Sequence, residues 1–231
     1  MLAATVFDLD ETLVDSAGAW QRALGSVAAR HGHRWTAEDW AAIQGRSTAF
    51  WSGYLADRCP GLTPQRAASA CVDVMVAAMA EGRFGLLPGA DDLVATAAGL
   101  GPVGLVSASP ARYVRAVALA FGLLPRLRAV VTGDDVRHGK PAPDPYLLAA
   151  HRIGLPPARC LAVEDSAAGI RSAHAAGMTV LAIPSPATAL DIDVLRLATH
   201  HAVDAYVAAK EIPALVSTRR PAPRSAPPLG R

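Results

Sequence analysis

Lysine is scarce in this sequence. Of its 22 basic residues, 20 are arginine, and Lys140 and Lys210 are the two lysines. The net charge is +2, and the segment from Ser217 onward carries four arginines and no acid, so the rest of the chain sums to 2 − 4 = −2. A chain with this balance lacks the basic face that nucleic acid requires, so we expect no nucleic-acid partner.

Cysteines and long apolar runs are also few. Cys59, Cys71 and Cys160 are odd in number and widely spaced, which predicts reduced, buried thiols rather than a disulfide framework or a zinc site. No apolar run approaches the length of a membrane span, and the start, MLAATVFD, has no basic residue before Asp8. We therefore expect a cytoplasmic protein with no membrane partner.

Hydrophobic residues, in contrast, make up 52% of the 231 residues, which is ample for a core. The first apolar run predicts a strand over 4–7. A long helical region follows, with helices expected over 17–30, 37–43, 47–57 and 64–80, and all four tryptophans fall inside it. The pair Thr63-Pro64 is typical of a helix start, with threonine as N-cap and proline at the first helical position.

From residue 86 the pattern changes to short apolar runs that alternate with helices, which indicates a parallel sheet with crossover helices. Strands are expected over 103–107, 128–133, 160–165 and 179–183, with a short last strand near Ala205. Ser109-Pro110 predicts the start of a helix that ends at Gly122, and Ser166 the start of one that ends at Gly177.

The predicted fold class is α/β, a doubly wound parallel sheet with an all-helical insertion after its first strand. The expected boundaries are 1–14 and 87–216 for the α/β core and 15–86 for the helical cap. The last stretch, 217–231, is rich in proline and arginine and lacks apolar periodicity, which predicts disorder.

Polar side chains follow the carboxyl ends of four predicted strands. In chain order they are Asp8, Asp10 and Thr12, then Ser107, then Lys140, then Glu164 and Asp165. In a parallel sheet these ends meet at one edge, where ligands bind. Together they offer what phosphoryl transfer needs: a nucleophile, positive charge for phosphate oxygens and an acid/base. Mg²⁺ favours oxygen ligands such as Asp8 and Asp165, and it would offset the repulsion between neighbouring acids.

Four segments, FDLDETLVDS, LVSASP, GKPAPDPYLLAA and VEDSAAGIRSAHAAGM, resemble the haloacid dehalogenase (HAD) superfamily in their order and content. The resemblance extends from Thr5 to about Ile183. It is closest to the phosphatase branch with a helical cap after strand one, which includes phosphoglycolate phosphatases and beta-phosphoglucomutases. One departure is Glu11, where relatives usually carry glycine, which adds a negative charge near the site.

The resemblance implies roles for individual residues. Asp8 would be the nucleophile that forms an aspartyl-phosphate. Asp10 would be the general acid/base, with its backbone carbonyl on Mg²⁺. The remaining implied roles are phosphate binding by Thr12, Ser107 and Ala108, a bridge between nucleophile and phosphate by Lys140, metal binding by Asp165 directly and by Glu164 through water, and substrate recognition by Gln44 and Arg46 of the cap loop.

Within the superfamily, the sequence favours a Mg²⁺-dependent phosphatase that acts on a small phosphorylated metabolite, as a monomer or homodimer. Dehalogenases lack the second aspartate of the motif, and Asp10 is present. Phosphonate-cleaving relatives use a cap lysine, yet no lysine precedes Lys140. A sugar-phosphate mutase of the beta-phosphoglucomutase type remains the alternative, although close mutases tend to have valine at position 12 and a lysine in the cap. A phospho-receiver signalling protein and a binding protein without activity rank below it.

Overall fold

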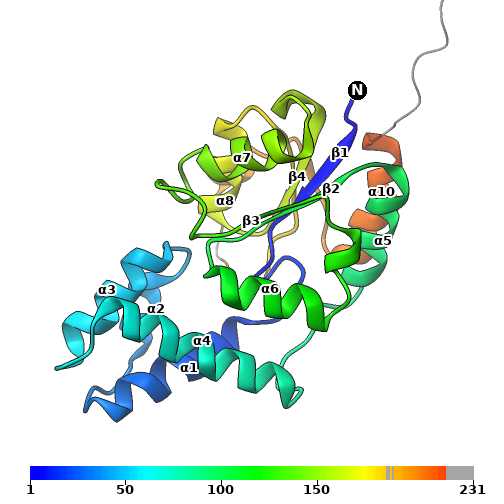
Figure 1. Ribbon diagram of the computed structural model, residues 1–231. Coiled ribbons are helices and arrows are strands. Elements are labelled where there is room, and N and C mark those ends of the chain that lie inside the picture. The colour runs from blue at the N-terminus through cyan, green and yellow to red at the C-terminus, as the bar shows by residue number, and fades with distance from the viewer. Residues whose placement is uncertain (186–187, 189, 217–231) are drawn as a thin grey trace, which may run out of the picture.

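The computed structural model describes residues 1–185, 188 and 190–216, so the predicted disordered tail lies outside the described residues. Six parallel strands form one sheet in the order β3-β2-β1-β4-β5-β6 (Figure 1). The strands are β1 (Ala4–Phe7), β2 (Val103–Val106), β3 (Ala129–Val131), β4 (Cys160–Glu164), β5 (Thr179–Ala182) and β6 (His200–His201). The doubly wound parallel sheet predicted from the sequence is confirmed.

Helices cover both faces of the sheet because strand side chains alternate between faces. Phe7 packs in a cluster with residues of α5 (Ala90–Leu100), α6 (Ala111–Ala120) and α10 (Ala205–Leu215). Its neighbour Val6 packs instead with α7 (Asp144–Ile153), α8 (Ala167–Ala175) and the short α9 (Ile192–Leu195). Two 3-10 turns, Leu124–Arg126 and Pro157–Arg159, precede β3 and β4.

Four helices between β1 and α5 form the predicted insertion, which appears as a separate lobe in Figure 1. They are α1 (Ala17–Arg30), α2 (Ala37–Ile43), α3 (Thr48–Arg58) and α4 (Pro64–Ala80). Thr36, Ser47 and Thr63 cap the last three, each accepting a backbone N–H with its hydroxyl oxygen. We refer to α1–α4 as the cap. Its four helices match the predicted ranges to within one residue.

Two local predictions are wrong. The expected last short strand is present as β6 at His200–His201 but not at Ala205, where α10 starts, because Asp204 accepts the N–H of Val207 as an N-cap and the apolar side chains then follow a helical period. Ser109 does not cap α6 either. Pro110 occupies the N-cap position, and the Ser109 hydroxyl donates to Asp10 instead.

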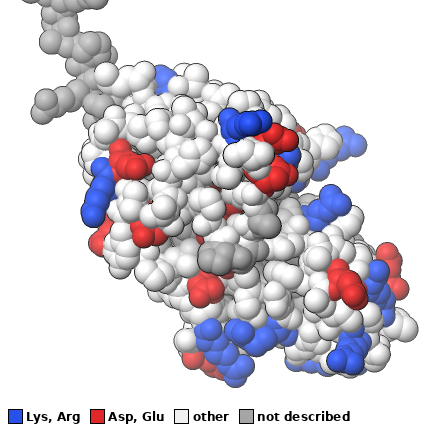
Figure 2. Space-filling model, turned by 180° about the vertical axis from the view of Figure 1, so that it is seen from behind, with Lys and Arg blue, Asp and Glu red and all other residues white. Residues whose placement is uncertain are grey.

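The prediction of reduced, buried cysteines is confirmed. Cys59, Cys71 and Cys160 are buried free thiols, and burial raises the pKa of each. Within the described residues, no helix is both long and apolar enough to cross a membrane. Figure 2 shows acidic and basic side chains interspersed on the face seen from behind.

Candidate active site

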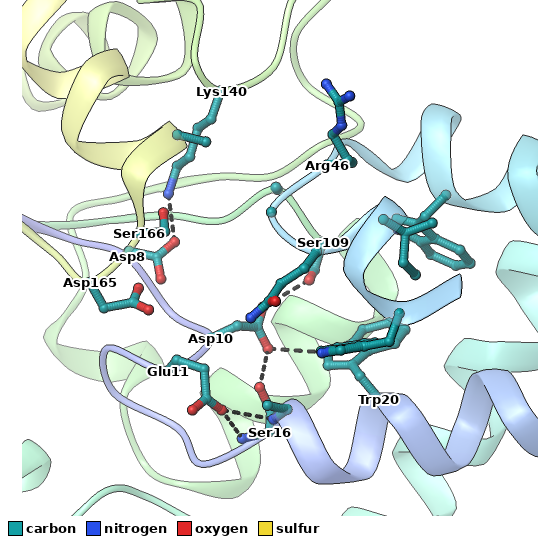
Figure 3. A pocket seen from close by; sticks show the side chains of 18 of the residues that line it. Asp8, Asp10, Glu11, Ser16, Trp20, Arg46, Ser109, Lys140, Asp165 and Ser166 are labelled. Carbon is teal, nitrogen blue, oxygen red and sulfur yellow. Dashed lines mark hydrogen bonds and ion pairs between the residues drawn. The ribbon is translucent and has the colours of Figure 1, made fainter. Parts of the chain in front are cut away.

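Three strand ends bring four ionisable side chains into one buried cluster, and Figure 3 shows three of them, Asp8, Lys140 and Asp165. Asp8 follows β1, Lys140 lies in the loop after β3, and Glu164 and Asp165 are at the end of β4. The Lys140 ammonium lies 2.5 Å from Asp8 Oδ1 and 2.5 Å from Glu164 Oε1. It also donates to the carbonyl of Val106 at 3.2 Å. The lysine thus joins the ends of β1, β2 and β4.

Glu164 is fully buried and accepts hydrogen bonds from several sides. The Tyr146 hydroxyl donates to Glu164 Oε1 at 2.6 Å, and the Ser166 hydroxyl donates to Oε2 at 3.0 Å. A Cβ at Gly169 would lie 1.9 Å from this carboxyl group, so only glycine leaves room for it. Glu164 is therefore fixed on the lysine by its surroundings.

The pKa values of Asp8, Asp165 and Lys140 are shifted by their buried surroundings. Burial raises the pKa of Asp8 to about 7, although the nearby Lys140 charge lowers it. Burial, reinforced by the negative charges of Asp8 and Glu164, raises the pKa of Asp165 well above its usual range. For Lys140, burial acts to lower the pKa, but the two partner carboxylates outweigh it and the pKa is raised. Three carboxyl groups share one lysine, so full ionisation would leave an excess of negative charge that a proton or a cation must offset.

This excess of negative charge fits a cation site. Asp8, Glu164 and Asp165 each place one carboxylate oxygen within 4.8 Å of the others. Asp165 Oδ2 is buried and has no hydrogen-bond partner among the described residues. A hard cation such as Mg²⁺ takes oxygen ligands of this kind, so the donor set suits it.

Thr12 lies behind this cluster and not on the cavity surface. It is 1% exposed, and its hydroxyl donates to Asp165 Oδ1 at 2.9 Å. The hydroxyl that the resemblance implied for phosphate binding therefore orients an aspartate here. The other oxygen of that aspartate is the one without a partner.

Five donors surround the carboxylate of Asp10. Oδ1 accepts from the Ser16 hydroxyl at 2.7 Å, the Tyr113 hydroxyl at 2.8 Å and the Trp20 indole N–H at 3.3 Å. Oδ2 accepts from the hydroxyls of Ser109 at 2.8 Å and Ser107 at 3.3 Å. Ser107, expected to bind phosphate, also accepts the backbone N–H of Ser109 at 3.0 Å.

Glu11 has a defined structural role. Its φ of 66° lies in the left-handed region, where glycine is favoured. Its Oε1 accepts the backbone N–H groups of Ser16 and Ala17 at 2.9 and 2.7 Å, at the start of α1, and its Oε2 accepts the Ser185 hydroxyl at 3.1 Å. The Glu11 carboxylate thus takes the place of an N-cap side chain for α1, while the Ser16 hydroxyl donates to Asp10.

A cavity of about 150 Å³ opens between this cluster and the cap. Asp8, Asp10, Lys140 and Asp165 form its polar end, with the backbone of Ala108 beside them. The cap contributes an apolar wall made of Trp20, Leu24, Trp40, Ile43 and Trp51. Gln44 and Arg46, the predicted recognition residues, also line it, although Figure 3 shows the Arg46 guanidinium pointing away from the carboxylates. That guanidinium lies 4.5 Å from the centre of the Phe50 ring.

Sequence reasoning did not assign the contacts of Ser16, Tyr113 and Tyr146. Tyr113 lies in α6 and Tyr146 lies in α7, and both helices pack onto the site. A buried tyrosine in a helix carries no local pattern that points to its partner, which is 103 residues away for Tyr113 and 18 residues away for Tyr146. Their role follows only from the packing of these helices against the strand ends.

The chain is similar to known proteins in sequence and in structure. The family model described as "Hydrolase: haloacid dehalogenase-like hydrolase" matches residues 2–177. Hexitol phosphatase A of Escherichia coli is 36% identical over 84% of this chain and 89% of its own length, and the fructose-1-phosphate phosphatase YqaB of the same organism is 30% identical over 76% and 93%. A crystal structure of a CbbY variant from Rhodobacter sphaeroides, in complex with xylulose-(1,5)bisphosphate, superposes with a TM-score of 0.80 at 27% identity, covering 89% of this chain and 96% of that one.

Proposed function

Because the chain belongs to the haloacid dehalogenase-like hydrolases, we propose that it is a phosphatase that releases phosphate from small sugar or sugar-alcohol phosphates. The observation that carries the proposal is the buried contact of Asp8 with Lys140, beside Asp165 and at the polar end of the cavity. This contact supports Asp8 as the nucleophile, because it holds the negative charge of the carboxylate next to the fixed positive charge of Lys140.

In the proposed reaction, Asp8 attacks phosphorus and the ester oxygen leaves, which gives an aspartyl-phosphate that water then hydrolyses. Lys140 holds Asp8 and neutralises a phosphoryl oxygen, while Glu164 and Tyr146 hold Lys140 in place. Asp10 donates a proton to the leaving oxygen and later takes one from the attacking water.

Mg²⁺ is the cofactor that the carboxylates suit, with Asp8 and Asp165 as its proposed direct ligands and Glu164 as a proposed ligand through water. The carbonyl of Asp10 is a further proposed ligand. When bound, the ion supplies positive charge that lets an anionic carboxylate approach an anionic phosphate. The Thr12 hydroxyl fixes one oxygen of Asp165, which leaves the other for the ion.

The cap side of the cavity supports a sugar-like substrate. Its indole rings offer flat apolar surfaces on which the C–H face of a sugar or polyol packs. Gln44 and Arg46 are the proposed recognition residues at the rim for hydroxyl groups or a second anionic group. The names of the relatives agree with this class, since they refer to a hexitol, to fructose 1-phosphate and to xylulose bisphosphate.

The test is phosphate release with Mg²⁺ from a panel of hexitol phosphates, ketose phosphates, xylulose 1,5-bisphosphate and phosphoglycolate. We expect turnover of at least one sugar or polyol phosphate and its loss on addition of EDTA. Glucose-phosphate isomers belong in the same panel. Their interconversion without phosphate release would replace the phosphatase with the mutase of the same superfamily.

A further inference from the structure

The carboxylate of Asp10 accepts more hydrogen bonds than a general acid/base requires. An ionised carboxylate offers about four lone-pair positions, and five donors lie within 3.3 Å of this one. The two oxygens differ in their partners. Oδ2 is bound only by serine hydroxyls, which rotate and both donate and accept. Oδ1 is bound by the hydroxyls of Ser16 and Tyr113 and, in addition, by the Trp20 indole, which donates only.

Trp20 and Tyr113 hold Oδ1 from opposite sides of the interface. Trp20 lies on α1 of the cap and lines the cavity, and Tyr113 lies on α6 and is fully buried. Their rings meet edge to face with centroids 5.0 Å apart. Burial and the neighbouring Asp10 raise the pKa of the Tyr113 phenol well above its usual range, so the phenol stays a donor.

We propose that Trp20 and Tyr113 are positioning residues that hold Oδ1 of Asp10 as an acceptor, so that Oδ2 is the oxygen that gives its proton to the leaving group. This inference rests on the proposed function. The bond from Asp8 to phosphorus forms as the bond from phosphorus to the ester oxygen breaks. That oxygen takes the proton from Oδ2, which leaves a neutral alcohol and an Asp10 carboxylate.

Trp20 also connects this geometry to the substrate. The same indole that donates to Oδ1 forms part of the wall against which the body of a bound ester packs, and its ring contacts Trp51 with centroids 5.7 Å apart. Trp51 lines the same wall, and no hydrogen bond joins it to Asp10 among the described residues. Trp51 is thus a matched control for the loss of an indole.

The experiment measures kcat/KM for a series of substituted phenyl phosphates and one alkyl phosphate, plotted against the pKa of the leaving alcohol. A well-placed general acid makes the rate insensitive to that pKa, so the wild-type slope is shallow. Trp20→Phe and Tyr113→Phe remove one donor each and are expected to steepen the slope. We expect a loss of about tenfold on the alkyl ester, set against about 10²–10⁴ for complete removal of a general acid. Trp51→Phe is expected to shift all esters by one common factor.

The outcomes separate the two proposals. Slopes that stay equal to wild type in both Trp20→Phe and Tyr113→Phe overturn the positioning role while the phosphatase stands, as does an equal steepening in Trp51→Phe. If Trp20→Phe fails to fold, the nearly isosteric Tyr113→Phe decides alone. A wild-type enzyme that releases phosphate neither from these esters nor from the sugar-phosphate panel overturns the proposed function itself.

Discussion

Glu11 shows how one unusual residue fixes the start of the cap. Among the described residues, it is the only one other than glycine with a positive φ. A left-handed residue with a Cβ costs about 1–2 kcal/mol. Three hydrogen bonds to its carboxylate, two of them from the first turn of α1, offset that cost. The negative charge noted from the sequence is therefore placed at the positive end of a helix.

Substitutions of Glu11 separate the contribution of the helix cap from the cost of the backbone strain. Glu11→Ala loses the helix cap but keeps the backbone strain, so we expect a loss of about 1–2 kcal/mol in the free energy of unfolding. Glu11→Gly loses the same bonds but removes the strain, so it should be the more stable of the two. Urea unfolding measures both. An alanine variant as stable as wild type would contradict the capping role.

Gly169 sets the position of Glu164. A methyl group there overlaps the carboxyl group, so Gly169→Ala is expected to displace Glu164 from Lys140 and Tyr146 and to reduce both activity and stability. Gly99→Ala is the matched control, because Gly99 also lies in a helix but has open space around it. It should be neutral or stabilising by up to about 1 kcal/mol. Phosphate release and thermal unfolding compare them, and equal behaviour of the two would count against this account.

At the scale of elements, the sequence predicted most strands and helices because each apolar run has one clear period. The helix α10 was missed because its segment is rich in alanine and contains Pro213, and its packing on α5 decides its form. In the site, Asp8, Lys140 and Asp165 were predictable from their places at strand ends. The bonds from Trp20 and Tyr113 to Asp10 were not, because they depend on how α1 and α6 pack together.

Asp39 joins α2 to α3 through one buried carboxylate. It accepts from Thr36, from the Tyr54 hydroxyl, from His33 and from Arg58. Burial acts to raise the pKa of Asp39, but these hydrogen bonds outweigh it and lower the pKa to about 2. Because the folded pKa lies below the ordinary value of 3.8, the stabilisation is complete above that pH and is lost as the pH falls toward 2.

Asp39→Asn should therefore be less stable than wild type at pH 7. The difference in the free energy of unfolding should begin to shrink below about pH 4, because the wild-type carboxylate then takes up a proton more readily in the unfolded chain. Urea unfolding at pH 7, 5 and 3.5 measures this difference. A difference that grows as the pH falls would show that another group is responsible.

At the scale of the whole molecule, core and cap are joined by two chain crossings that lie side by side. Val14 pairs with Leu86, and the N–H of Leu87 donates to the carbonyl of Leu13 at 2.9 Å. We propose that the division into core and cap falls at this pair, at residues 14–15 and 86–87. A third contact bridges the lobes, since the Thr48 hydroxyl donates to the carbonyl of Ala108 at 3.0 Å.

Metal binding should stabilise the folded chain as a whole, because the carboxylate cluster exists only when the strand ends meet. At a Mg²⁺ concentration a hundred times its Kd, mass action adds about 2.7 kcal/mol, which raises Tm by about 5–10 °C for a chain of this size. Differential scanning calorimetry with Mg²⁺ and with EDTA measures the shift. The shift should be absent in Asp165→Asn. A wild-type Tm that is the same with Mg²⁺ and with EDTA would contradict the proposed metal site.

The central claim is that Asp8 takes the phosphoryl group from the substrate. The most direct measurement is a rapid acid quench of the enzyme with a ³²P-labelled sugar phosphate that it hydrolyses, followed by peptide mapping of the labelled chain. Label should appear on the peptide that contains Asp8 and be lost within the time of turnover, and Asp8→Asn should give neither label nor phosphate release. Phosphate release that persists in Asp8→Asn, or label on another residue, would contradict the claim.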